Sequence, residues 1–102
     1  MGLFSDLFSF LIDITDDSYI ASSERWFDNV YKRINHVESS EGRLEVRSGN
    51  LYRKLYVTFR DGSSLVITDE KDNGRELRYI NLNSEQKKQL LREGFVTIRE
   101  YE

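Results

Sequence analysis

His36 is the only histidine of the chain, so it is the only side chain of the type that most often serves as acid and base near neutral pH. The chain has no cysteine, which excludes thiol nucleophiles, disulfides and zinc–thiolate sites. The spacing around His36 gives no Ser–His–Asp arrangement, and no glycine-rich loop could hold a phosphate. We therefore predict that the chain is not an enzyme and that His36 lies in the last turn of a helix, facing its dipole.

Two acidic stretches contain residue types that can ligate a metal ion. Asp16 and Asp17 lie in a polar break over residues 15–18, where helix capping or solvation explains them better. Residues 69–80 are faintly similar to a calcium-binding loop. However, Lys71 stands where an oxygen ligand is needed, and Ile80 stands where a bidentate glutamate belongs. The sequence therefore predicts no metal site and no cofactor.

The residues best suited to binding are tyrosines interleaved with basic side chains. The net charge of the chain is −3, yet residues 43–60 contain five basic residues and one acidic residue. Tyrosine and arginine carry much of the binding energy at protein interfaces, and they also contact bases and phosphates on sheet surfaces. The alternative is that cross-strand Tyr–Arg pairs only stabilise a solvated sheet. The candidate binding residues are Arg43, Arg47, Tyr52, Lys54, Tyr56 and Tyr79.

Residues 43–82 are predicted to form the four-stranded antiparallel meander that positions these side chains. Apolar and polar residues alternate along it, which is typical of half-buried strands. The expected inner face holds the apolar set: Leu44, Val46, Leu55, Val57, Phe59, Leu65, Ile67, Ile80 and Leu82. The outer face holds the candidate binding residues with Thr58, Val66, Thr68 and Leu77.

The register of the first two strands depends on the turn between them. A loop centred on residues 49–50 places Glu45 opposite Lys54 and Arg43 opposite Tyr56. The rival loop, one residue earlier, places Arg43 directly opposite Lys54. Like charges in that position are unfavourable, so we predict the first register.

The next two turns are also set by glycine. A three-residue loop with Gly62 in the left-handed conformation aligns Val57 with Leu65 and keeps both on the apolar face. The Asn-Gly pair at residues 73–74 predicts a type I′ turn, which would place the fourth strand beside the third.

Three helices are expected around the sheet. Residues 3–14 form an apolar stripe that we expect to pack on the core, with docking on a partner or a second subunit as the alternative. This segment is too short and too acidic to span a membrane. Residues 23–37 should form a second helix across the inner face. Asn83 and Gln86 form a capping-box pattern for the last helix, which Gly94 ends.

The fold class predicted is α+β, in the order α-α-β-β-β-β-α-β, with the helices mainly on one face of the sheet. A fifth strand around Val96 and Ile98 must join one edge, and the sequence leaves both edges open. Residues 1–102 should form a single domain. Its parts are a helical segment over 1–37, the meander over 43–82, and the last helix and strand over 84–101.

The function expected is that of a non-enzymatic protein-binding module, such as a small inhibitor, immunity or adaptor protein, which occludes a partner protein through the Tyr/Arg-rich face. In size and type the chain resembles small proteins of phages and mobile elements that block host enzymes. The alternative is a nucleic-acid-binding protein using the same face, which the overall acidity opposes. The absence of cysteine favours an intracellular, cytoplasmic location. No membrane partner is expected, and a homodimer could form through residues 3–14.

Overall fold

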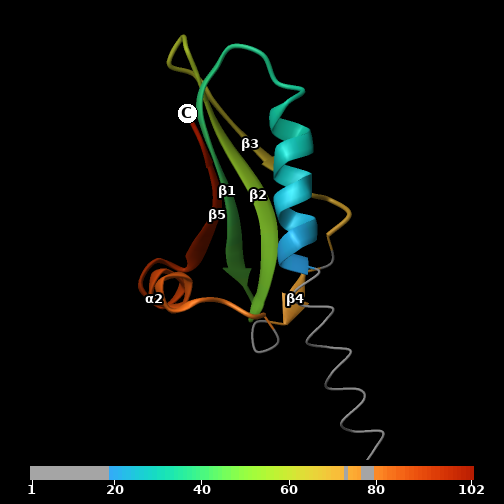
Figure 1. The fold of residues 1–102 in the computed structure, drawn as a ribbon, viewed down its shortest axis with the longest axis vertical. Helices are drawn as coiled ribbons and strands as arrows, with labels where there is room; N and C mark the ends of the chain where they lie inside the picture. The colour runs from blue at the N-terminus through green and yellow to red at the C-terminus, as the bar shows by residue number, and fades with distance from the viewer. Residues whose placement is uncertain (1–18, 73, 77–79) are drawn as a thin grey trace, which may run out of the picture.

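The computed structural model describes residues 19–72, 74–76 and 80–102. The described residues form an α+β fold with one antiparallel sheet in the order β3-β2-β1-β5, as Figure 1 shows, and β4 pairs with β2. Two helices flank the sheet in the described part of the chain. The strands are β1 (Val37–Arg47), β2 (Asn50–Phe59), β3 (Ser64–Thr68), β4 (Arg75–Glu76) and β5 (Phe95–Tyr101).

The N-terminal helix, described over residues 19–31, covers one face of the sheet, which we call the inner face (Figure 1). Phe27 is fully buried and lies against Gly42 of β1, where a side chain would not fit. Burial alternates along β1 and β2, so each strand presents every second residue to the helix. The prediction that a helix covers the apolar face is confirmed. The core contains Tyr19, Phe27, Leu44, Leu51, Leu55, Val57, Ile80, Leu82, Leu90 and Val96.

The N-terminal helix ends at residue 31 rather than at residue 37. Its last turn tightens, because the amides of Arg33 and Ile34 bond to carbonyls three residues earlier. The chain then reverses through His36, which has a φ of 64°, and Val37 already begins β1. The prediction that His36 faces the dipole from a last helical turn is therefore wrong.

Strand β1 starts six residues earlier than predicted and contains residues 39–42, which lie between the predicted second helix and the predicted meander. Its register with β2 is the rival one, since Arg43 faces Lys54 and Glu45 faces Tyr52. The turn is Ser48-Gly49, whose φ values of 53° and 81° are those of a type I′ turn. This turn matches the right-handed twist of the strands. Glu41 and Glu45 neutralise Arg43 and Lys54, the two cations that face each other.

The register between β2 and β3 is confirmed. Val57 faces Leu65, and Gly62 has a φ of 89°, as the three-residue loop requires. The predicted position of the fourth strand is wrong, because β4 pairs with residues 50–51 of β2 and follows β3 along the same edge. Leu65 is 45% exposed because no described strand covers β3 there, which corrects its assignment to the core.

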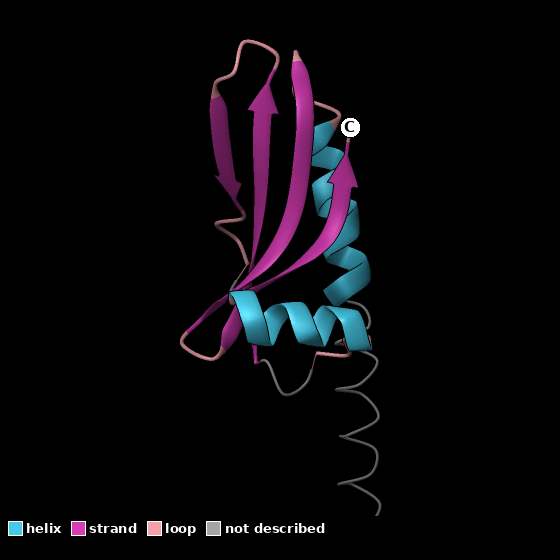
Figure 2. Ribbon diagram, turned by 90° about the vertical axis from the view of Figure 1, so that its left-hand side faces the viewer, coloured by secondary structure: helices cyan, strands magenta, loops and turns pink. Residues whose placement is uncertain are grey.

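The helix α2 (Ser84–Glu93) has the predicted capping box between Asn83 and Gln86, and Gly94 ends it in the left-handed conformation. In Figures 1 and 2 it crosses one end of the sheet on the side opposite the N-terminal helix. The two described helices therefore lie on different sides, not mainly on one face.

Strand β5 joins β1 at the edge. Val46, predicted to be in the core, is 38% exposed at the end of β1.

Candidate functional site

Arg43 lies in β1, between β2 and β5, with its side chain on the outer face, which is the face of the sheet opposite the N-terminal helix. Figure 2 shows this side of the sheet. Its guanidinium carbon lies 4.4 Å from the ring centroid of Tyr56 and 3.9 Å from that of Phe95. These are cation–π distances, and Tyr56 and Phe95 come from the strands on either side of β1. The sheet therefore holds an arginine between two aromatic rings.

Carboxylates fix this arrangement. Arg43 Nη2 donates to Glu41 Oε2 over 2.8 Å, and the Tyr56 hydroxyl donates to Glu45. Burial alone would raise the pKa of Glu41, but hydrogen bonds from Arg43 and Thr97 lower it, so this carboxylate is charged at neutral pH. Burial and the bond to Glu45 raise the pKa of Tyr56. Arginine, tyrosine and carboxylates are therefore held in fixed positions.

The other predicted binding residues are placed unequally around this cluster. Lys54 Nζ lies 3.1 Å from Glu45 Oε2, so the expected contact forms, although diagonally rather than directly across the strands. Arg47 is exposed at the turn end of β1. Tyr52 is half-buried, with its ring against Gly74. Tyr79 lies outside the described residues. The structure thus brings together Arg43, Lys54 and Tyr56.

A groove of about 450 Å³ adjoins the ring of Tyr56. It runs between β2 and the C-terminal end of β5 and carries three carboxylates, Glu41, Glu100 and Glu102. Of the lining residues that the structure describes, only Arg43 is basic, and it is already paired with Glu41. The groove therefore has an acidic character.

The sequence pattern did not indicate Phe95, Glu41 and Thr97 as members of this site. Glu41 lies outside the predicted meander, and Phe95 could not be placed while the edge joined by the last strand was open. Gln89 of α2 supports the same cluster, because its amide oxygen accepts the Thr97 backbone N–H over 2.9 Å and Thr97 donates to Glu41. A choice of β1 as the partner of β5 would have placed Phe95 on the outer face.

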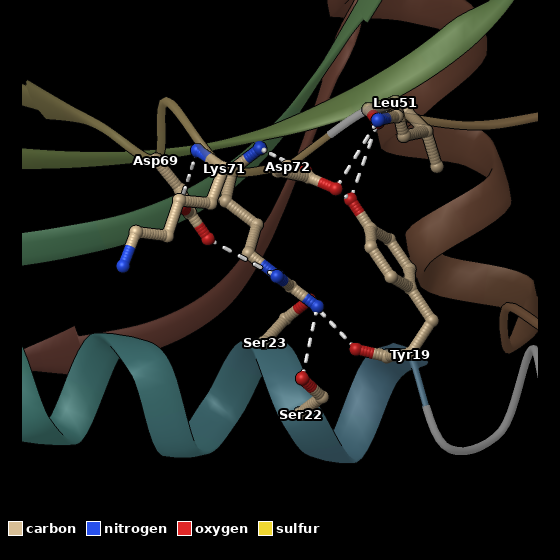
Figure 3. A network of polar contacts seen from close by, with 9 residues as sticks. Tyr19, Ser22, Ser23, Leu51, Asp69, Lys71 and Asp72 are labelled. Carbon is tan, nitrogen blue, oxygen red and sulfur yellow. Dashed lines mark hydrogen bonds and ion pairs between the residues drawn. The ribbon is translucent and has the colours of Figure 1, made fainter.

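A second polar cluster, on the inner face, surrounds Arg53. Figure 3 labels its partners Ser22, Ser23 and Asp69. Its guanidinium donates to Ser23 Oγ over 2.7 Å and to Ser22 Oγ over 3.0 Å, and it pairs with Asp69 over 3.1 Å. The guanidinium carbon also lies 4.4 Å from the ring centroid of Tyr19. Only 11% of the side chain of Arg53 is exposed. This cluster joins the N-terminal helix, β2 and the loop after β3.

Two carboxylates of that loop, Asp69 and Asp72, are engaged in structural contacts. Asp69 accepts from Arg53 and from the amide of Lys71. Asp72 accepts from the Tyr19 hydroxyl over 2.7 Å and from the amides of Arg53 and Gly74. Among the described residues, no group of three or more histidine and acidic side chains is arranged to hold a metal ion. We therefore assign the Arg53 cluster to stability.

His36 lines a separate hollow of about 470 Å³ with Phe59, Arg60 and the following turn. Among the described residues that line it, the one carboxylate is Asp61, which accepts hydrogen bonds from the amide and the hydroxyl of Ser63 over 2.9 and 2.6 Å. Those bonds lower the pKa of Asp61, so it is a poor acid–base partner for an imidazole at neutral pH. The described lining of this hollow therefore does not offer His36 an acid–base partner.

Over the part of the chain that the structure describes, no helix is both long and apolar enough to cross a membrane. The chain matches no protein-family model, no curated protein and no solved structure, so the outer face is the candidate site on the strength of its own residues.

Proposed function

We propose that the chain is a non-enzymatic protein-binding module, of the inhibitor, immunity or adaptor type, which occludes its partner through the outer face. The observation that carries this proposal is the position of Arg43 between Tyr56 and Phe95. Arginine and tyrosine dominate the binding energy of protein interfaces. Because Glu41 and Glu45 already order these side chains, binding would cost little further side-chain entropy.

The acidic groove beside Tyr56 favours a partner protein that presents a basic side chain to it. Glu41, Glu100 and Glu102 line it, and the lowered pKa of Glu41 keeps that carboxylate ionised. A lysine or arginine of the partner could enter the groove and meet complementary charge. The groove would give specificity, and the neighbouring aromatic rings would give buried contact area.

The pairing of the cations argues against a nucleic acid as the partner. Of the five basic residues in 43–60, Arg43 and Lys54 are paired with carboxylates on the outer face, and Arg53 is on the inner face. Backbone binding requires cations that can release counterions from phosphates. We therefore expect no salt-dependent retention of the chain on single-stranded or duplex nucleic acid at low ionic strength.

A photo-crosslinking amino acid tests the proposal in the full chain. Placed at Thr58, which is exposed and lines the groove, it should crosslink one protein in an extract of the cells that encode the chain. The matched control is Arg25, an exposed residue of the N-terminal helix. Equal crosslinking of the same protein from both positions, or crosslinking that Tyr56→Ala leaves unchanged, would overturn the proposal.

A further inference from the structure

Strand β3 forms one edge of the sheet and has no described neighbour on its outer side (Figure 2). Its five residues, Ser64–Thr68, contain no charge, proline or glycine. Natural proteins usually protect an edge with charges, proline or a bulge. The opposite edge, β5, carries Arg99 and Glu100 and has a register shift in its pairing with β1. Only the β3 edge, of these two, is built like a strand that receives a partner.

The backbone of β3 shows which groups are free to pair. At its two ends, the Phe59 amide donates to the Ser63 carbonyl and the Asp69 amide donates to the Arg53 carbonyl. Hydrogen-bonded pairs alternate along antiparallel strands, so odd-numbered residues of β3 bond to β2. The amides and carbonyls of Ser64, Val66 and Thr68 therefore point away from the sheet.

We propose that this edge binds a second copy of the chain, with β3 antiparallel to β3 about a two-fold axis at Val66. In this register Ser64 faces Thr68 of the second copy, and Val66 faces its own counterpart. The amides and carbonyls of Ser64, Val66 and Thr68 all point outward, as a ladder of hydrogen bonds between the two copies requires. On the inner face Leu65, now 45% exposed, would pack against Ile67 of the second copy.

Charges beyond the strand ends favour a second copy over an unrelated segment. The same register brings the turn that contains Asp61 towards Lys71 of the second copy, and the two-fold axis repeats this pair. Asp61 and Lys71 are both exposed in the single chain. In this register the apolar side chains and the outward hydrogen-bonding groups of β3 match those of a second copy. The charged residues beyond the two strand ends match as well. This contact is independent of the proposed binding through the outer face and of a dimer through residues 3–14.

A charge-swap experiment on the full chain tests the two-fold axis. Interfaces smaller than ~1,200 Å² are typically weak, so sedimentation equilibrium should find wild-type dimers forming between ~1 and ~500 µM. Val66→Lys and Val66→Glu should each remain monomeric, because each places like charges opposite one another, and their equimolar mixture should form heterodimers. Leu91→Lys, at a position that is 88% exposed on α2, should dimerise like the wild type.

Hydrogen exchange of the wild-type chain gives a second measurement that needs no variant to fold. Protection of the Ser64, Val66 and Thr68 amides should rise with protein concentration, whereas Leu65 and Ile67 should be protected throughout. A wild-type chain that is monomeric at ~500 µM would overturn the proposal. So would Val66→Lys dimers as stable as those of the wild type, which would place the contact elsewhere, or exchange at Val66 that is independent of concentration.

Discussion

The ring of Phe27 lies so close to the backbone of Gly42 that a Cβ atom at position 42 would fall 2.6 Å from its ring carbons. Phe27 is fully buried, so the ring has no free space into which it could move. We expect Gly42→Ala to lower the free energy of unfolding by about 1–3 kcal/mol through overpacking. Urea denaturation would measure this loss.

A double-mutant cycle assigns that loss to the contact. Phe27→Leu removes the ring, so Gly42→Ala should cost much less in the Phe27→Leu background than in the wild type. Equal costs in the two backgrounds would mean that the helix does not lie against Gly42 as described.

The Arg53 cluster should contribute more to stability than any exposed arginine. Arg53→Met would leave Asp69 with 11% of its side chain exposed and no cation beside it. Breaking such a buried pair costs on the order of 3 kcal/mol. The matched control is Arg60→Met, in an exposed turn, where we expect a change within about 0.5 kcal/mol. If the two variants are equally stable, the cluster does not hold the loop after β3 to the helix.

Stability should fall at alkaline pH because burial and hydrogen bonds to carboxylates oppose the ionisation of Tyr19 and, to a smaller degree, of the half-buried Tyr101. Burial and the hydrogen bond to Asp72 raise the pKa of Tyr19 above its ordinary value of 10.0, and burial and Asp28 raise that of Tyr101. The unfolded chain loses the Tyr19 proton first as the pH rises above 10.0. The contribution of Tyr19 to stability is therefore complete below that pH and is lost above it, by up to about 1.4 kcal/mol per pH unit, whereas solvent screening makes the contribution of Tyr101 smaller.

Tyr19→Phe isolates one of these contributions. Guanidinium denaturation at pH 8 and near pH 11 should show a smaller alkaline loss in the variant than in the wild type. The comparison removes the effect of lysine deprotonation, which both proteins share. An identical loss in both proteins would contradict the hydrogen bond between Tyr19 and Asp72.

The turn at Ser48-Gly49 can be improved by one substitution. Ser48 has a φ of 53°, which asparagine adopts more readily than serine. Ser48→Asn should therefore raise the melting temperature, with a gain of about 0.5 kcal/mol. Ser48→Pro, whose ring fixes φ near −65°, should destabilise the chain. A loss of stability in Ser48→Asn would favour the register that we first predicted from the sequence.

The elements of the fold could be predicted where one local rule decided them. The three-residue loop at Gly62 was predictable because a two-residue turn at Asp61-Gly62 would have moved Leu65 and Ile67 to the polar face. The capping box at Asn83 and the end at Gly94 follow directly from neighbouring residues. These features depend on a few adjacent side chains, which the sequence displays.

The register of β1 and β2 could not be predicted from directly opposed charges, because same-strand and diagonal partners also decide the electrostatic energy. Arg43 does face Lys54, but Glu41 and Glu45 neutralise them, and Phe95 arrives from a distant strand. The role of Arg53 was also missed, although its position in the alternating pattern places it on the apolar side with Leu51 and Leu55. Its partners, Ser23 and Asp69, come from two distant segments.

The most direct measurement is the dissociation constant between the full chain and the protein that crosslinks from Thr58. Tyr56→Ala should weaken this binding by about 10- to 100-fold, because the ring and the support for Arg43 are both lost. Arg25→Ala should bind like the wild type. Binding that Tyr56→Ala leaves unchanged while Arg25→Ala weakens it would contradict the claim that the outer face is the binding surface.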